Sequence, residues 1–562
     1  MDKPLHTRLH VLCALSCAAI GGWQAWLVRD SWLDTDGFDY LWAGRAWTER
    51  SPDGAINGYW SPLYSWLLAI LEPAVHVKPG FESRVMALAN FLILLVAIAA
   101  FYVFWCELER VQRASGAFHG FLFVWLGWAL FEWSCVEQMQ LNSGFTDRLA
   151  AALIYVSGAL LCRLRREPRS WWPFLLLGWA LGLSYLARAG QFVIAPAFLL
   201  ASVVAQPGPR RAAIGRSLLA TAAFLSLSVP WIQALSTAFD EPMFGPAGVI
   251  AYATFVERVP DAWLGDPSHG SPRLPPRVVH QRPLISALPM GTSHDYWNDL
   301  ARRFVGYRPR LAPHLHLWKM AKNSSVLFRM LLTGGLAFVA GLALLIRVAW
   351  KDWSLRRTWQ DGSFLMIPAA WAAIVYVCVH VETRYLMPYL VLFAGGIVCG
   401  VILPRQRDSN RLVLMLVALM TGYLALQAAV HLLGFAREAP ANFAHNAGMA
   451  EATSEAWRLG LRPGDPVACL PTYAPPWIVD RFMVSARVKC LVYAEEPAAA
   501  RLFSYRNSTA DRLLDEFARL GCKAAIVHFG TQKPPQGWRP LGPPFLGIFV
   551  NSLSRPDQVT QR

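Results

Sequence analysis

Long apolar segments recur along most of the chain and predict membrane-spanning helices. About eleven of them are almost purely apolar, and most approach the roughly 20 residues that an α-helix needs to cross the hydrocarbon core. The pattern therefore predicts a mainly α protein, a polytopic transmembrane helical bundle of about 11 spans. We expect these spans at 9–28, 82–105, 117–138, 146–162, 171–187, 189–205, 212–234, 324–346, 363–380, 385–403 and 412–434.

Arginine is concentrated in every second connection between these segments. Because cytoplasmic loops are enriched in Lys and Arg, we place the N-terminus and all five arginine-bearing connections in the cytoplasm. The outer loops 29–81 and 235–323 and the tail after 434 then lie outside, as in a multi-pass protein of a bacterial inner (plasma) membrane. The inner groups are Arg110 and Arg113; Arg163, Arg165, Arg166 and Arg169; Arg210, Arg211 and Arg216; Arg347, Lys351, Arg356 and Arg357; and Arg405, Arg407 and Arg411.

One apolar segment, 62–77, does not fit the alternation. It is short and carries Pro62, Glu72, Pro73 and His76. If it crossed the membrane, every later arginine group would lie outside. We therefore expect an interfacial or re-entrant helix there.

After residue 434 the composition changes to that of a water-soluble domain. Short apolar runs (VACL, VKCLVYA, KAAIVHF and LGIFVNSL) alternate with the helical patterns EATSEAWRLGL and TADRLLDEFARLG. This alternation predicts a small extracytoplasmic α/β domain, so we divide the chain into a membrane domain (1–434) and a C-terminal domain (435–562). No nucleophile with an adjacent base stands out in the tail, and we expect it to have an accessory or acceptor-facing role.

The overall charge does not change this interpretation. The chain has 55% hydrophobic residues, 25 Trp and a net charge of +15. The predicted cytoplasmic loops account for the basic excess, so it does not indicate nucleic-acid binding. The expected surroundings are the lipid bilayer. Three tail cysteines, Cys469, Cys490 and Cys522, permit at most one disulfide, and we expect buried, unpaired thiols.

The first outer loop contains the best candidates for chemistry. Asp30, Asp34, Asp36 and Asp39 lie within ten residues of one another at the outer end of a predicted span. A carboxylate at that level can act on a membrane-delivered substrate as a base or metal ligand. The alternative is that acidic residues simply populate an outer loop.

This loop resembles the GT-C glycosyltransferases, polytopic enzymes that include protein O-mannosyltransferases and the lipid A aminoarabinose transferase. The resemblance lies in D-G-F-D-Y-L, followed about twenty residues later by N-G-Y-W-S-P-L-Y-S-W-L-L. It implies a polyprenyl-phosphate sugar donor, an extracytoplasmic acceptor and a divalent cation as a candidate cofactor. It also implies that Asp36, in D-x-x-x-Y with Tyr40, is the catalytic base, with Asp39 and Asp34 as alternatives. Gly37 stands where the family usually has a second acid.

Two further stretches, around Arg384 and Asp147, extend the resemblance to the outer ends of later spans, and Arg188 is a candidate on physical grounds alone. The sequence HVETRYLMPYL is similar to the family's R-Y-x-x-P element and implies that Arg384 and Tyr385 contact the donor. An arginine at the membrane boundary can also bind phosphate on chemical grounds alone, although it can equally serve as an anchor or pair with Glu382. Asp147 is a candidate donor-site residue or a helix cap, and Arg188 either meets phosphate or extends to the interface.

The predicted function is therefore that of an integral membrane glycosyltransferase. A transporter or flippase is the main alternative, but it would need polar groups near the middle of the bilayer. Here the polar residues collect at the outer ends of the spans. A third interpretation is a non-catalytic protein of the same fold that acts in envelope assembly.

Overall fold

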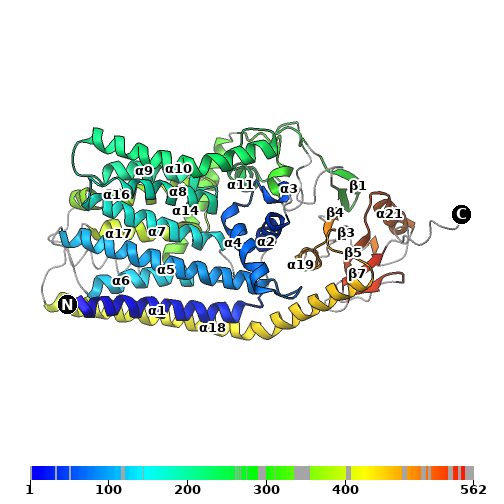
Figure 1. Cartoon of the computed structure of the whole chain (residues 1–562), viewed down its shortest axis with the longest axis horizontal. Helices are drawn as coiled ribbons and strands as arrows, with labels where there is room; N and C mark the ends of the chain where they lie inside the picture. The colour runs from blue at the N-terminus through cyan, green and yellow to red at the C-terminus, as the bar shows by residue number, and fades with distance from the viewer. Residues whose placement is uncertain are drawn as a thin grey trace.

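The computed structural model describes most of the chain. It covers residues 3–550 apart from 32–34, 50–51, 115–120, 143–144, 260–262, 264, 266, 274, 289–298, 311, 334–354, 400–406, 471–476, 495–501, 504–507, 530–535 and 542–545. Asp34 lies outside the described residues. In the described part, a long bundle of helices occupies one end of the molecule and a mixed β-sheet the other (Figure 1).

Five helices in the described ranges are long and apolar enough to cross a membrane, namely Leu5–Val28, Ser83–Ala114, Arg210–Phe239, Leu355–Val379 and Val417–Arg458. They lie in α1 (Lys3–Val28), α5 (Ser83–Ala114), α10 (Arg210–Phe239), α16 (Leu355–Val379) and α18 (Arg407–Arg458). The predicted count of about eleven is therefore not established. Other predicted spans form α6 (Phe121–Phe131), α7 (Phe145–Arg166), α8 (Trp172–Ala187), α9 (Gln191–Val204), α14 (Pro313–Thr333) and α17 (Thr383–Cys399), and 334–354 lie outside the described residues.

The start of α7 is attached to a π-helical turn at the end of α6. The turn Glu132–Glu137 continues α6 with π-helical hydrogen bonding, a geometry that disturbs the regular backbone pairing. The fully buried guanidinium of Arg148 donates to the carbonyl oxygens of Cys135, at 3.3 Å, and of Met139. This contact anchors the first turn of α7, which carries Asp147.

Three short helices lie between the bundle and the sheet: α2 (Thr35–Thr48), α3 (Pro52–Ala55) and α4 (Pro62–Val75). The segment 62–77, expected to be interfacial or re-entrant, forms the 14-residue α4. Gly44 lets α2 approach α4 closely, because a Cβ there would lie 2.8 Å from the carbonyl oxygen of Ser65. The loop before α4 is held by the buried Asp299, whose carboxylate accepts from the backbone N–H groups of Gly58 at 2.9 Å and Tyr59 at 3.2 Å.

The sheet has seven strands in the order β1-β2-β4-β3-β5-β7-β6. The four apolar runs of the tail form strands, as predicted: β3 (Pro466–Leu470), β4 (Lys489–Ala494), β5 (Ala524–His528) and β7 (Leu546–Val550). Strand β3 pairs in parallel with β4 and β5, whereas β6 (Arg539–Pro540) and β7 are antiparallel. The hairpin of β1 (Arg277–Gln281) and β2 (Leu284–Ala287) was not predicted. It comes from the outer loop 235–323 and pairs with β4.

Two helices join the sheet to the membrane bundle. The predicted boundary at 434/435 falls within α18, a continuous helix of 52 residues. Helix α19 (Trp477–Ala486) lies beside α2, where Arg45 donates to the carbonyl oxygen of Val484 at 2.5 Å. Arg45 also forms an ion pair with Glu72 of α4 at 2.6 Å, so α2, α4 and α19 form one connected unit. Helix α21 (Ser508–Arg519) packs against β5. Cys469, Cys490 and Cys522 are buried and do not take part in a disulfide.

Candidate functional site

Helix α2 carries three of the predicted site residues on consecutive turns. Asp36 lies in its first turn and is half-buried, while Asp39 and Tyr40 follow one turn later. The Asp39 carboxylate accepts a hydrogen bond from Trp60 Nε1 at 3.1 Å. Tyr40 is buried, with its ring centre 4.9 Å from that of Trp60 and 5.3 Å from that of Tyr64. The two parts of the sequence motif, DGFDYL and NGYWSPLY, thus pack directly against each other.

The two described carboxylates of this motif lie in different surroundings. Burial raises the pKa of Asp39 well above its usual range, and the nearby charges of Asp36 and Asp480 raise it further. This shift favours the protonated form of Asp39, whereas a base must start unprotonated. Asp36 is therefore the better candidate for a base.

Two arginines converge on Asp147 from different helices. Asp147 is buried in the first turn of α7 and forms ion pairs with Arg188, which directly follows α8, and with Arg384 in the first turn of α17, at 3.3 Å. The charge of Asp36 also acts on Arg384. Residues from α2, α7, α8 and α17, which are far apart in sequence, therefore form one charged cluster at one end of the bundle.

The ring of Tyr385 lies between these arginines. The guanidinium carbon of Arg188 lies 3.4 Å from its centre and that of Arg384 lies 5.5 Å away. Both positions are within the range of cation–π attraction. Tyr385 thus holds two positive charges close together, although they repel each other.

Arg384 also pairs with Glu382, which the sequence analysis gave as an alternative role for this arginine. Its Nε donates to Glu382 at 2.6 Å, and Glu382 accepts a second hydrogen bond from His380 at 3.1 Å. Burial opposes ionisation of Glu382, but the hydrogen bond from His380 and the charge of Arg384 outweigh it and lower its pKa to about 2. Both ion pairs of Arg384 use Nε. Within the described ranges, its terminal nitrogens make no hydrogen bond.

The C-terminal part contributes a carboxylate that the sequence did not reveal. Asp480 on α19 lies close enough to Asp39 to raise its pKa. Burial raises the pKa of Asp480 itself to about 7, although the charge of Arg303 partly opposes this. No motif surrounds Asp480 in the sequence, and its nearness to α2 depends on the docking of α19.

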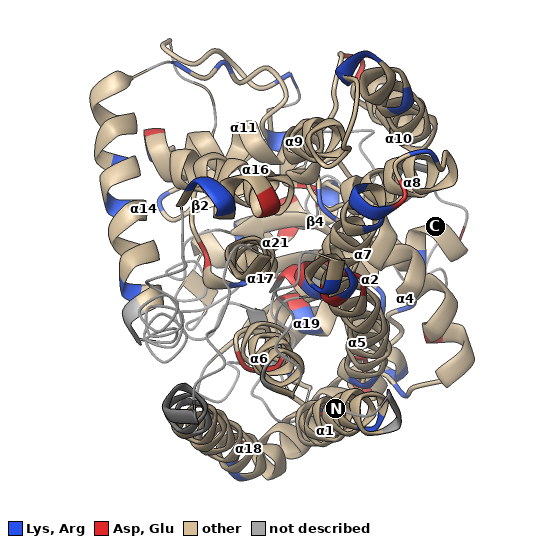
Figure 2. Cartoon of the chain, turned by 90° about the vertical axis from the view of Figure 1, so that its left-hand side faces the viewer, with Lys and Arg blue, Asp and Glu red and all other residues tan. Residues whose placement is uncertain are grey.

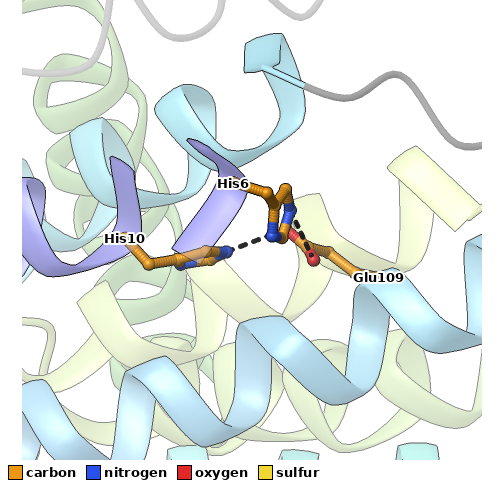
Figure 3. A group of neighbouring side chains, drawn as sticks. All are labelled: His6, His10 and Glu109. Atoms are coloured by element: carbon orange, nitrogen blue, oxygen red, sulfur yellow. Dashed lines mark hydrogen bonds and ion pairs between the residues drawn. The ribbon is translucent and has the colours of Figure 1, made fainter. Parts of the chain in front are cut away.

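The residues that could hold a metal ion lie elsewhere. Among the described residues, His6, His10 and Glu109 form a group with ligand atoms within 4.8 Å of one another. Figure 3 shows the two histidines of α1 pointing toward Glu109 of α5. Trp128 Nε1, however, donates to His10 Nδ1 at 3.0 Å, so Nε2 of His10 carries the proton and donates to Glu109 at 3.1 Å. A metal-bound histidine normally has the opposite arrangement, and this group is therefore a hydrogen-bond network.

Comparison with known proteins gives likenesses of structure only. No known family and no curated protein matches the chain. Among solved structures, it is similar to ArnT from Cupriavidus metallidurans bound to undecaprenyl phosphate, with a TM-score of 0.49 and 11% identity over 99% of this chain and 100% of that one.

It is also similar to the Archaeoglobus fulgidus oligosaccharyltransferase. The complex of that enzyme with Zn and sulfate gives a TM-score of 0.46 and 13% identity, over 92% of this chain and 68% of that one. The structure of AglB from the same organism with an inhibitory peptide and a dolichol-phosphate gives a TM-score of 0.44 and 11% identity, over 98% of this chain and 75% of that one. ArnT and AglB are GT-C glycosyltransferases, but likenesses at this level do not identify the reaction of this chain.

Proposed function

We propose that this protein is an integral membrane glycosyltransferase of the GT-C type, which transfers a sugar from a polyprenyl-phosphate donor to an extracytoplasmic acceptor. The observation that carries the proposal is the cluster of Arg384, Arg188 and Asp147 beside Asp36. It combines a carboxylate that can act as a base with two guanidiniums that can bind phosphate. It also lies on the residues that carry the family resemblance.

The proposed reaction is a direct displacement at the anomeric carbon. The acceptor hydroxyl oxygen forms a bond to this carbon while its proton passes to the Asp36 carboxylate. The bond between the carbon and the phosphate oxygen breaks, and the phosphate leaves with the electron pair. Arg384 and Arg188 offset the negative charge that develops on it. Holding donor and acceptor together removes the entropy cost of their encounter.

Each described residue has a distinct part in this proposal. The terminal nitrogens of Arg384 can bind two phosphate oxygens in parallel, while its Nε stays on Glu382 and Asp147. Asp147 and Tyr385 keep the two arginines in place. Tyr40 packs α2 on Trp60 and thereby orients Asp36.

A divalent cation has no clear set of ligands in the described part of the cluster. Both carboxylate oxygens of Asp147 already meet arginines, and burial favours the protonated form of Asp39 by raising its pKa. Protonated or arginine-paired carboxylates are poor ligands for a divalent cation.

The domains and the orientation form part of the same proposal. We propose that residues 1–434 form the membrane domain and 435–562 the extracytoplasmic domain, with Asp36 and Arg384 on the outer side. The contacts of Arg45 with Val484 and Glu72 bring α19 to the helix that carries Asp36. This arrangement suits a tail that helps to receive the acceptor.

The test is chemical analysis of the cell envelope. Lipids, glycans and glycoproteins from a deletion strain should lack one sugar modification when compared with the parent by mass spectrometry. The wild-type gene should restore it and the Asp36→Asn variant should not. If the deletion leaves every glycan unchanged, or if Asp36→Asn restores the modification fully, the proposed function is wrong.

A further inference from the structure

A cavity of about 660 Å³ lies at the opposite end of the bundle from the proposed site. Its walls come from the last turns of α5, α7 and α17 and the early part of α16, whereas the proposed site uses the first turns of α7 and α17. Figure 2 shows this end of the bundle, with the positions of Lys and Arg coloured blue along several helices. The lining residues are Arg110, Val111, Ala114, Arg165, Arg166, Glu167, Asp361 and Cys399. The volume is typical of a small-molecule site.

Positive charge exceeds negative charge around this cavity. Glu107 forms ion pairs with Arg110 at 2.5 Å, Arg166 at 3.5 Å and Arg163 at 3.8 Å. Glu167 also pairs with Arg163 and Arg166. Asp361 pairs with Arg165 and Arg357, both at 3.5 Å. In this network, five arginines therefore share three carboxylates.

The buried Glu107 gives the arginines a fixed geometry. Its side chain is 5% exposed, whereas that of Arg110 is 54% exposed. Two buried atoms of this network, Glu107 Oε2 and Arg166 Nε, face each other at 3.5 Å. The ion pairs to Glu107 hold the guanidiniums in place, so an anion that bound there would meet cations that are already positioned.

Apart from its charged residues, the lining is apolar. Val111, Ala114 and Cys399 contribute to the walls, so the cavity offers an apolar surface beside three arginines, two of whose carboxylate partners, Glu167 and Asp361, also line it. This combination suits a molecule with a phosphate group joined to hydrocarbon. The enrichment of cytoplasmic loops in arginine explains the charges, but it does not explain why three of them line one cavity.

We propose that this inner cavity binds the phosphate headgroup of an anionic phospholipid. The bound headgroup lies against Arg110, Arg165 and Arg166, and the start of an acyl chain lies against Val111 and Ala114. Basic pockets between membrane helices bind such headgroups when they face the anionic leaflet. The proposal does not depend on the glycosyltransferase reaction.

Native mass spectrometry of the purified full chain in detergent tests the proposal. Phosphatidylglycerol, diacylglycerol and glycerol 1-phosphate are each titrated. The first has both phosphate and acyl chains, the second lacks the phosphate and the third lacks the chains. We expect phosphatidylglycerol to bind about tenfold or more tightly than either of the others.

Two variants locate the site. Arg110→Gln with Arg166→Gln removes two positive charges, and Ala114→Trp fills the cavity while leaving every charge in place. Each should weaken phosphatidylglycerol binding about tenfold or more. Arg210→Gln with Arg211→Gln is the matched control, because these exposed arginines begin α10 outside the cavity, and it should change binding less than about twofold. Gel filtration checks that each variant is folded.

Three outcomes would overturn the proposal. Equal binding of diacylglycerol would mean that the phosphate is not recognised. Equal binding of glycerol 1-phosphate would identify a site for soluble phosphate compounds. If Ala114→Trp is folded and binds phosphatidylglycerol like the wild type, the lipid does not occupy this cavity.

Discussion

The two ends of the helical bundle both concentrate charged side chains, but they arrange them differently. At the end with α2, two arginines meet on one buried carboxylate, Asp147, and on one aromatic ring, Tyr385. At the other end, the buried Glu107 pairs with three arginines, of which Arg110 and Arg166 line a cavity. The first arrangement places a potential base beside its cations, and the second has no such carboxylate.

This difference shows how similar residues can support different chemistry. A reaction needs a proton acceptor and a charge-stabilising group that face the same atoms. Asp36 and Arg384 meet the electrostatic part of this requirement, because the charge of one acts on the other. The arginines that line the cavity, Arg110, Arg165 and Arg166, pair with carboxylates, and we expect them to serve in binding alone.

The largest expected effect concerns the orientation of the two ends. Fusions to a reporter that is active only outside the cytoplasm should give a signal after residues 55, 270 and 500 and none after residues 166 and 355. The contrast should be all or none. A silent fusion after residue 500 would place the sheet in the cytoplasm. The end of the bundle with α2 would then be the inner end, and the end with the cavity would be the outer one.

The next largest effect is expected at Asp36. Asp36→Asn keeps the size of the side chain but cannot accept a proton, so transfer should fall about 100-fold to 10,000-fold. Asp39→Asn is the matched control, because burial raises the pKa of the Asp39 carboxyl and so favours its neutral form. It should retain activity within about threefold, since the neutral amide resembles that neutral form. Turnover of the purified variants decides between them, and the reverse result would make Asp39 the base.

A smaller effect is expected at Arg384. Arg384→Gln removes the cation while Glu382 loses its partner, and transfer should fall about 10-fold to 100-fold. Glu382→Gln breaks the same ion pair but keeps the arginine, so its loss should stay under about fivefold. Steady-state kinetics with varied donor would measure both. Equal losses in the two variants would show that Arg384 matters through its pair with Glu382.

The smallest effect is a pH-dependent change in stability at Asp480. Its pKa is raised to about 7 in the folded protein, above the unfolded value of about 3.9. Stability therefore falls as the pH rises between these values, because the folded state alone must bury the charge. Asp480→Asn should raise the melting temperature by about 2–4 °C at pH 8, by about a third of that at pH 5, and hardly at all at about pH 4. The same rise at all of these pH values would exclude the titration of Asp480 as its cause.

Local patterns in the sequence predicted the helical bundle and the strands of the tail. The apolar runs at 82–105 and 212–234 form α5 and α10, and VACL forms most of β3. Patterns of this kind depend on neighbouring residues, so they can be detected without the fold. Motif resemblance likewise singled out Asp36 and Arg384, which the fold brings into one cluster.

Features that depend on contacts between distant residues were not predicted. The β1–β2 hairpin forms an edge of the sheet because Ile285 pairs with Ala494, more than 200 residues later. Asp480 lies near Asp39 only because α19 docks on α2. Asp299 holds the loop at Gly58 from a position 241 residues away. No local spacing signals such pairings.

The unbroken helix α18 has a mechanical consequence. At about 1.5 Å per residue, its 52 residues form a rod of about 78 Å that connects the bundle to the sheet. Because the rod is helical, inserting one residue into it would lift the sheet by about 1.5 Å and rotate it by about 100°. The length of α18 thus sets the distance of the sheet from the bundle, and its helical phase sets the rotation of the sheet about the helix axis. Together they determine how the sheet meets α2.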